Sequence, residues 1–118
     1  MERTNELRQE QRTGHWNLMR FRSDTYDAQQ AVEQTAFAEG ELSVKTKELL
    51  ALGIAVQTGS EAMIQQYAKR AAGSGASFRE SVEAVEVAIA LGGAQAAAAA
   101  RFAFYSLDQL YSQEILKL

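Results

Sequence analysis

The chain contains no cysteine and no proline, and His15 is its only histidine. Without cysteine, disulfide bonds, thiolate catalysis and thiolate metal sites are excluded. One histidine among scattered carboxylates gives no cluster with the spacing of metal ligands, so we expect neither a metal nor a cofactor. Because proline is absent and glycines separate the periodic segments, the sequence predicts an all-helical protein.

Charge is also modest, with 12 basic and 15 acidic residues and a net charge of −3. An acidic balance argues against a nucleic acid or an anionic membrane as the partner. Two basic pairs are too short for a binding stripe and are interpreted as solvated surface: Arg20 with Arg22, and Lys69 with Arg70. The longest uncharged run, residues 87–100, is too short to span a bilayer. With a polar, charged start, we expect no signal peptide and a cytoplasmic protein.

At 118 residues the chain can bury one modest core, and we expect a single domain over residues 1–118. Good helix formers dominate its composition. Helix start and stop signals divide it into about six helices. Their expected bounds are residues 5–12, 25–39, 44–58, 60–72, 77–91 and 94–111.

These bounds rest on local signals. Ser43 and Ser60 each precede a helical run and are predicted N-caps. Ser77 and Glu80 have the spacing of a capping box, which is a fairly specific sign of a helix start. Glycine is expected to interrupt or end helices at three places: Gly14, Gly40 and Gly92-Gly93.

The apolar residues indicate which helices pack. The helix over 44–58 is apolar around most of its circumference, which predicts a central, buried helix. The dense apolar patch over 15–21 should dock on the core. The helix over 25–39 should pack through Tyr26, Ala31, Val32, Thr35 and Ala36. The C-terminal region carries more large apolar side chains than one core can hold: Phe102, Phe104, Tyr105, Tyr111, Ile115 and Leu116. We therefore expect a homo-oligomer.

A candidate site follows from helical spacing. Ser60, Met63 and Tyr67 are spaced i, i+3, i+7 and lie on one face of their helix. Glu48 lies on the preceding helix, which a tight turn should pack antiparallel. A carboxylate among leucines must find a partner, shift its pKa upward or reach water. If Glu48 is structural, its expected partner is Arg101 or a backbone donor.

Segment 42–76, LSVKTKELLALGIAVQTGSEAMIQQYAKRAAGSGA, resembles the core of the carboxymuconolactone decarboxylase / alkylhydroperoxidase D-like family. Further similarity at residues 14–19, at Gly92-Gly93 and at 100–103 extends the resemblance over most of the chain. It implies the alkylhydroperoxidase D-like helical bundle as the fold. It also implies assembly with itself, into a homohexamer first and a homotrimer second.

Peroxidase members of that family carry Cys-x-x-Cys followed by a histidine one helical turn on, and an acid that belongs to a proton relay. Here Ser60, Met63 and Tyr67 stand at the redox positions, and Glu48 matches the relay acid. Only a thiolate is nucleophilic enough to open the peroxide bond. The resemblance therefore implies a peroxiredoxin-like oxidoreductase fold without thiol-dependent peroxidase activity.

Three functions fit these residues. The first is an oligomeric scaffold with a disabled redox site, engineered or naturally degenerate. The second is a cysteine-free decarboxylase or isomerase of a small cyclic acid, with Glu48 as general acid/base and Tyr67 and His15 orienting the substrate. The third is an oligomer that binds a small ligand in the vacated pocket. The structural readings of the same residues are a hydrogen-bonded His15, a packing Tyr67, Met63 as core filling and Ser60 as an N-cap.

Overall fold

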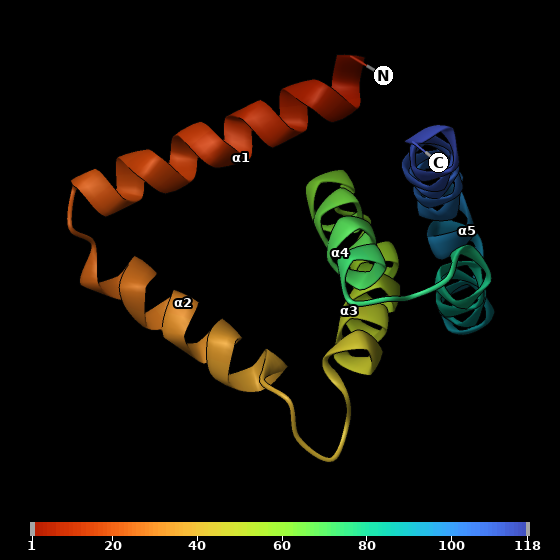
Figure 1. The fold of residues 1–118 in the computed structure, drawn as a ribbon, viewed down its shortest axis with the longest axis horizontal. Helices are drawn as coiled ribbons and strands as arrows, with labels where there is room; N and C mark the ends of the chain where they lie inside the picture. The colour runs from red at the N-terminus through yellow and green to blue at the C-terminus, as the bar shows by residue number, and fades with distance from the viewer. Residues whose placement is uncertain (1, 118) are drawn as a thin grey trace. The chain divides into compact units, whose positions relative to one another are not determined.

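The computed structural model describes the backbone of residues 2–117 and the side chains of residues 5–14 and 21–112. Over that backbone it contains five helices and no strand, so the all-helical prediction is confirmed. They are α1 (Glu2–Arg20), α2 (Asp24–Phe37), α3 (Val44–Thr58), α4 (Glu61–Gly73) and α5 (Phe78–Lys117). Figure 1 shows their order, and the chain divides into two compact units, Met1–Gly40 and Glu41–Leu118.

The core of the second unit lies between α3, α4 and α5, each of which packs against the other two. Small and branched apolar side chains fill it: Leu52, Ala55, Val56, Ile64, Ala68, Ala71, Val85, Ala88, Ala103 and Leu107. Alanines let neighbouring helices approach closely, and the larger side chains fill the space that remains. α3 is the central helix, as its apolar composition predicts.

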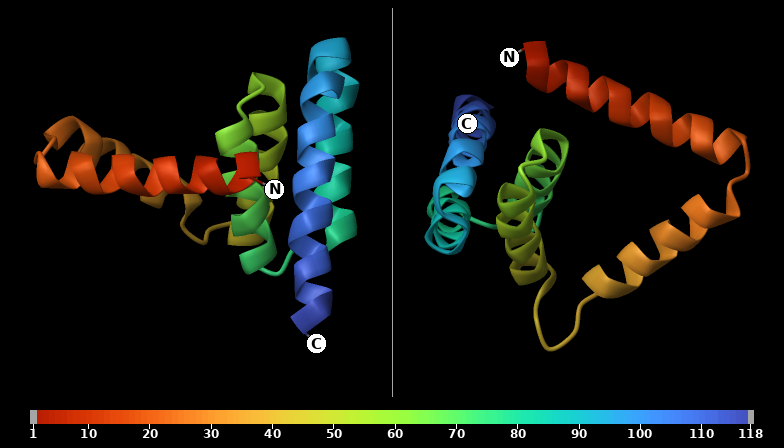
Figure 2. Two further views of the ribbon diagram at one scale, coloured as in Figure 1. Left: turned by 90° about the horizontal axis from the view of Figure 1, so that it is seen from above. Right: turned by 180° about the vertical axis from the view of Figure 1, so that it is seen from behind.

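α5 is a helical hairpin. Gly93 has φ 67° and ψ −143°, which breaks the helix into arms over residues 78–92 and 94–117. Figure 2 shows the arms side by side in opposite directions. Their ends meet where the Tyr111 hydroxyl donates to the Ala76 carbonyl at 2.7 Å and its ring meets Phe78 edge-on. The two C-terminal helices expected from the sequence are therefore confirmed as these arms.

α3 and the first arm of α5 run in the same direction. Lys45 Nζ lies 3.1 Å from Glu80 Oε2 at their starts, and Gln57 Nε2 donates to the Ala88 carbonyl at 2.6 Å nearer their ends. A Cβ at Gly92 would lie 2.6 Å from Gln57 Oε1, so glycine there leaves room for this contact. α4 is the connection that carries the chain back between the two parallel helices.

The predicted caps are confirmed. Ser43 Oγ accepts from the Thr46 amide at 3.1 Å. The Ser77 amide donates to Glu80 Oε1 at 2.9 Å, while the Glu80 amide donates to Ser77 Oγ at 3.0 Å, which is a complete capping box. These side chains occupy amide groups that a helix start leaves without intrahelical partners.

The first unit contains two helices that diverge from a turn at residues 21–23, where Arg22 has φ 54°. The predicted interruption at Gly14 is wrong, because α1 continues through it. A single glycine costs a helix only about 1 kcal/mol, which good helix formers around it offset. The predicted end at Gly40 is also wrong: α2 ends at Phe37, and the Ala38 amide bonds to the Thr35 carbonyl.

Several predicted packing faces are exposed within this chain. No residue of α2 is buried, although five were expected to pack, and Val32 is 63% exposed. Phe21 of the predicted docking patch is 69% exposed, and the side chains of residues 15–20 lie outside the described residues. α3, which was predicted to be central and buried, buries one side in the core, while Leu50 and Ile54 on its other side are exposed.

By length and composition alone, α5 over residues 78–112 is apolar enough to cross a membrane. Its turn at Gly93 folds it into two shorter arms, so it is not one straight span. The same two-glycine break interrupts the longest uncharged run of the sequence.

Gly93→Ala should lower the free energy of unfolding by about 1–3 kcal/mol, because a side chain strains this left-handed backbone conformation. Urea denaturation followed by circular dichroism would measure the change. Gly73→Ala is the matched control: Gly73 ends α4, and an added Cβ would meet nothing within 4 Å. Equal effects of the two substitutions would contradict the account of Gly93 as the hairpin's hinge.

Glu80→Gln should remove an acid-sensitive part of the stability. Its hydrogen bond from the Ser77 amide, and then the nearby Lys45 ammonium, lower the pKa of Glu80 below its ordinary value of 4.5. A lowered folded pKa gives stability that is complete above the unfolded value and is lost as the pH falls through the folded one. Melting temperatures of wild type and variant should thus converge in acid and separate near neutral pH. Glu83→Gln, outside the capping box, should keep the wild-type dependence.

Candidate functional site

Ser60 is fixed as the N-cap of α4. Its Oγ accepts a hydrogen bond from the Met63 amide at 3.2 Å, with Ser60 itself in an extended backbone conformation. The predicted capping role is confirmed. The hydroxyl therefore serves the helix start, where it satisfies one of the amides that would otherwise lack a partner.

Met63 and Tyr67 follow Ser60 along the same face of α4. Met63 is half-buried, and Tyr67 is buried with 9% of its surface exposed. Beside them on this helix, Ile64, Ala68 and Ala71 are fully within the core. The positions that match the family's cysteine and histidine are thus occupied by side chains that pack.

Glu48 is the charged group that the fold buries most deeply in this region. Its side chain is 4% exposed, and its Oε2 lies 3.1 Å from Arg70 Nε of α4. Arg70 is 34% exposed, so the pair connects the core with the surface. The guanidinium favours the charged form of the carboxylate, and losing either partner would leave the other charge poorly compensated.

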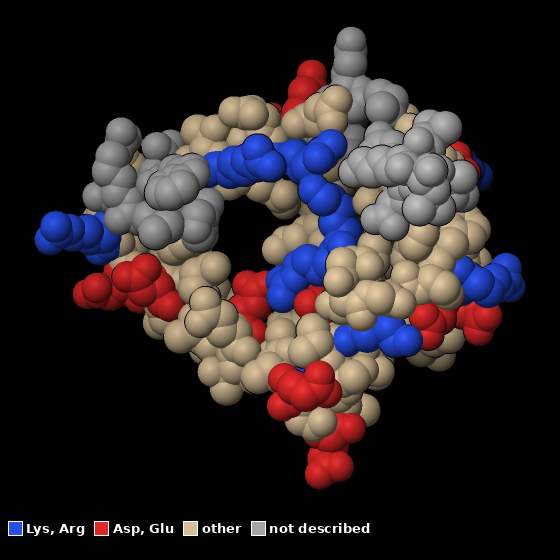
Figure 3. All heavy atoms as spheres, in the orientation of Figure 1, with Lys and Arg blue, Asp and Glu red and all other residues tan. Residues whose placement is uncertain are grey.

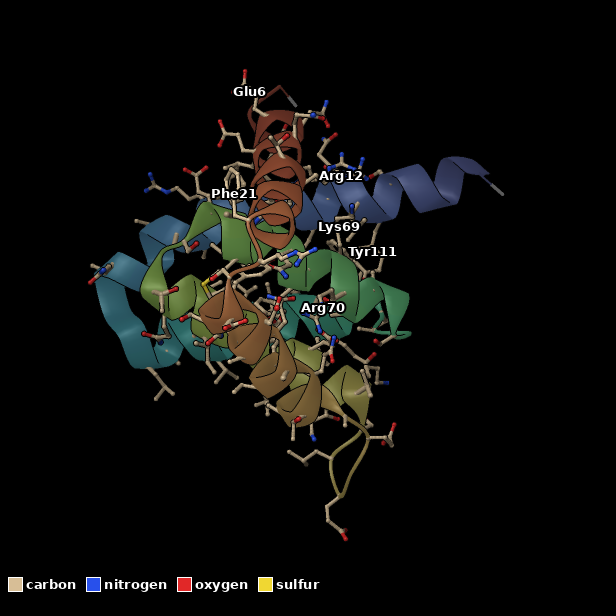
Figure 4. All side chains as sticks on the ribbon, turned by 90° about the vertical axis from the view of Figure 1, so that its left-hand side faces the viewer. Glu6, Arg12, Phe21, Lys69, Arg70 and Tyr111 are labelled. Carbon is tan, nitrogen blue, oxygen red and sulfur yellow. The ribbon has the colours of Figure 1, made fainter. Side chains whose placement is uncertain are left out.

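Arg70 corrects two sequence predictions. Arg101, one of the two expected partners of Glu48, is exposed on α5, and the ion pair is made by Arg70 instead. Arg70 was also expected to be solvated surface together with Lys69. Lys69 is exposed, whereas Arg70 reaches the buried acid; both are labelled on α4 in Figure 4. Arg70 therefore lies on the side of α4 that faces α3, whereas Lys69 lies on an exposed side.

Arg70 also contacts Tyr67. The guanidinium carbon lies 5.2 Å from the centroid of the Tyr67 ring, within the range of a cation–π contact. Arg70 therefore bridges Glu48 on α3 and Tyr67 on α4. Two of the three predicted catalytic residues are brought together in this way, whereas the side chain of the third, His15, lies outside the described residues.

Ser60 lies at the other end of the helix pair. α3 and α4 are joined by the short turn at 59–60, so Glu48 near the start of α3 is level with Arg70 near the end of α4. At 1.5 Å per residue, Ser60 is roughly 15 Å along α4 from Arg70. The structure thus places the acid with Tyr67 and separates it from the hydroxyl of Ser60.

Acidic and basic side chains both occur on the face shown in Figure 3. Among the described residues, no three histidine, aspartate or glutamate side chains come close enough together to hold a metal ion. The Glu48–Arg70–Tyr67 cluster is therefore the chemically distinctive feature of this part of the chain.

Comparison with known proteins places the chain in a family. The model of the carboxymuconolactone decarboxylase family matches residues 23–105. A protein of that family from Legionella pneumophila has a similar structure, with a TM-score of 0.87 at 20% identity over 92% of this chain and 97% of the other. A family protein from Thermotoga maritima, for which a role in the antioxidative response has been suggested, gives 0.85 at 24% identity over 95% of each chain. No curated protein matches significantly.

Arg70→Met should destabilise the fold by about 1–3 kcal/mol, because it removes the cation beside a buried carboxylate. Adding Glu48→Gln should recover part of this loss, since the double variant no longer buries the charge. Unfolding free energies of the two single variants and the double variant give the coupling between the residues. Arg101→Met is the control and should change stability by less than about 0.5 kcal/mol. Additive single effects would contradict the pairing.

Proposed function

Because the chain belongs to the carboxymuconolactone decarboxylase family, we propose that it is an oligomeric scaffold of that family whose peroxiredoxin-type thiol site is disabled. The observation that carries the proposal is the use of the redox positions: Ser60 caps α4, and Met63 and Tyr67 pack along the same face. None of these side chains provides the thiolate that peroxide reduction in this family needs.

The setting of Glu48 supports the same conclusion. A relay acid must exchange a proton with the reacting group during turnover. Here the carboxylate is buried, and its Oε2 lies 3.1 Å from Arg70 Nε, so the acid is engaged in an ion pair between helices. The one surviving residue of the family's relay thus contributes to the link between α3 and α4.

The oligomeric part of the proposal rests on the exposed apolar faces of α2, α3 and α5. Leu91 is 82% exposed, and Val32, Val87 and Ile54 are each more than half exposed. Exposed apolar surface of this extent in a small protein marks an interface. We propose a homohexamer, with a homotrimer as the next possibility, in the cytoplasm.

Fewer observations support the two other functions that the sequence suggested. A decarboxylase or isomerase acting on a small cyclic acid would use Glu48 as its base, next to Tyr67 and Arg70. Turnover of such an acid that Glu48→Gln abolishes would favour it. Ligand binding without turnover would appear as thermal stabilisation by the same compounds.

The wild-type protein should not consume hydrogen peroxide or an organic hydroperoxide with dithiothreitol as the reductant, beyond the rate of the buffer alone. The triple variant Ser60→Cys, Met63→Cys, Tyr67→His should gain this activity, because it restores two thiols at a helix N-terminus, where thiolates are stabilised.

The double variant Ser60→Cys, Met63→Ser is the matched control, since it has one thiol without its partner and should not turn over. Thiol-dependent peroxide consumption by the wild type would overturn the proposal. Inactivity of the triple variant would mean that the surroundings of α4 no longer support the chemistry. Peroxidase activity would then have been lost through changes at more positions than these three.

A further inference from the structure

The Arg70 side chain contacts the acid of α3 and an aromatic ring of α4 at the same time. Its Nε lies 3.1 Å from Glu48 Oε2, and its guanidinium carbon lies 5.2 Å from the centroid of the Tyr67 ring. Glu48 and Tyr67 are both buried. The guanidinium therefore lies against the buried carboxylate and also against the side chain at the position that matches the family's histidine.

Helical spacing places position 67 between a nucleophile position and Arg70. Met63 lies four residues before Tyr67 on α4, and Arg70 lies three residues after it. Residues three or four apart are neighbours on one face of a helix. A nucleophile at 63 and a base at 67 would thus be one turn apart. Such a base is in turn oriented by a third group, and Glu48 is the acid that α3 brings to this face.

A guanidinium is an unusual neighbour for an acid that is to serve a base. All of its nitrogens are donors, and it is not deprotonated in proteins. The Glu48 oxygen that lies beside Arg70 Nε therefore faces a charge that neither accepts a proton nor passes one on. A base at position 67 would have to compete with this ion pair for the same carboxylate.

We propose that Arg70 is a fourth position at which the site is disabled, because it holds the Glu48 carboxylate and withholds it from a base at position 67. This role rests on the proposed function and deepens it: replacing the three redox positions alone leaves the acid engaged by Arg70. Arg70 is a positioning residue here, since it acts through Glu48 and not on a reacting atom.

The chemistry to be restored is the reduction of a hydroperoxide by two thiols. In the triple variant Ser60→Cys, Met63→Cys, Tyr67→His, here called the restored protein, the imidazole takes the proton of the thiol at 63. That thiolate attacks a peroxide oxygen, the O–O bond breaks, and the imidazolium returns the proton to the leaving oxygen. The sulfenic acid formed then condenses with the thiol at 60, which gives a disulfide and water. Dithiothreitol reduces this disulfide and is itself oxidised to a disulfide.

The kinetic test compares the restored protein with and without Arg70→Met. With dithiothreitol in excess, Arg70→Met should raise the rate constant for hydroperoxide reduction by about 10-fold or more, because the acid becomes available to the base. Glu48→Gln should abolish this gain. In the restored protein with Arg70 intact, Glu48→Gln should change the rate by less than about two-fold, since the acid is already engaged.

Lys69→Met is the matched control. Lys69 is the neighbouring basic residue on α4, labelled with Arg70 in Figure 4, and it lies on an exposed side of the helix. It removes the same charge from the protein without removing the ion pair of Glu48, so it should not raise the rate. An equal gain from Lys69→Met would mean that net charge, and not the release of Glu48, sets the rate, which would overturn the role of Arg70.

A second measurement needs neither thiols nor turnover. In Tyr67→His, the imidazole at position 67 can be titrated by proton NMR, with His15 as the reference in the same spectrum. Adding Arg70→Met should raise the pKa of this imidazole by about one unit, because a cation is removed and the carboxylate is released. Adding Glu48→Gln as well should lower that pKa again. This last step is decisive, since removal of any nearby cation raises the pKa of an imidazole.

Circular dichroism should show that each variant remains helical. If Arg70→Met prevents folding, Glu48→Gln in the restored protein still decides the question, because it leaves Arg70 unchanged. A large loss of activity in that variant would overturn the role of Arg70, since the acid would already serve the base.

The outcomes distinguish the role of Arg70 from the proposed function on which it rests. Thiol-dependent peroxide reduction by the wild type would overturn both. Equal rates of the restored protein with and without Arg70→Met, together with an imidazole pKa that does not respond to Glu48→Gln, would overturn the role of Arg70 alone. The disabled thiol site would then remain the function proposed for the chain.

Discussion

A carboxylate buried among apolar helices is the constraint on which the second unit depends. Glu48 lies inside α3, so the fold must supply a cation at that depth, and Arg70 of α4 does so. This requirement sets the rotation of α4 about its own axis. The same rotation directs Tyr67 to the guanidinium and keeps Ser60, Met63 and Tyr67 along one inward stripe. The ion pair, the packing of α4 and the side chains at the redox positions therefore all depend on the same orientation of this helix.

The sequence predicts the helix starts well because caps are local. Ser43, Ser60 and the Ser77–Glu80 box each bind amides within a few residues, so their spacing contains the information. Glycine is less informative. Gly93 turns the chain, whereas Gly14 continues a helix, because only the surrounding packing decides which conformation a glycine adopts.

The partner of Glu48 could not be chosen from local signals, since Arg70 and Arg101 are both arginines on neighbouring helices. One pattern does distinguish them. Arg70 continues the i, i+3, i+7 series of Ser60, Met63 and Tyr67 to i+10, which places it on the stripe facing α3. The exposure of Leu50 and Ile54 is a different kind of failure. Apolar composition predicts that a side chain is covered, but not that the cover belongs to the same chain.

The lack of any buried residue in α2 has a consequence for how the protein responds to dilution. An isolated helix of 14 residues is marginal in water, because too few hydrogen bonds follow its costly first turn. Its helical content must then depend on contacts beyond its own turns. If those contacts come from another copy, order in the first forty residues becomes a function of protein concentration. The melting temperature would then depend on the protein concentration and would not be a property of the single chain.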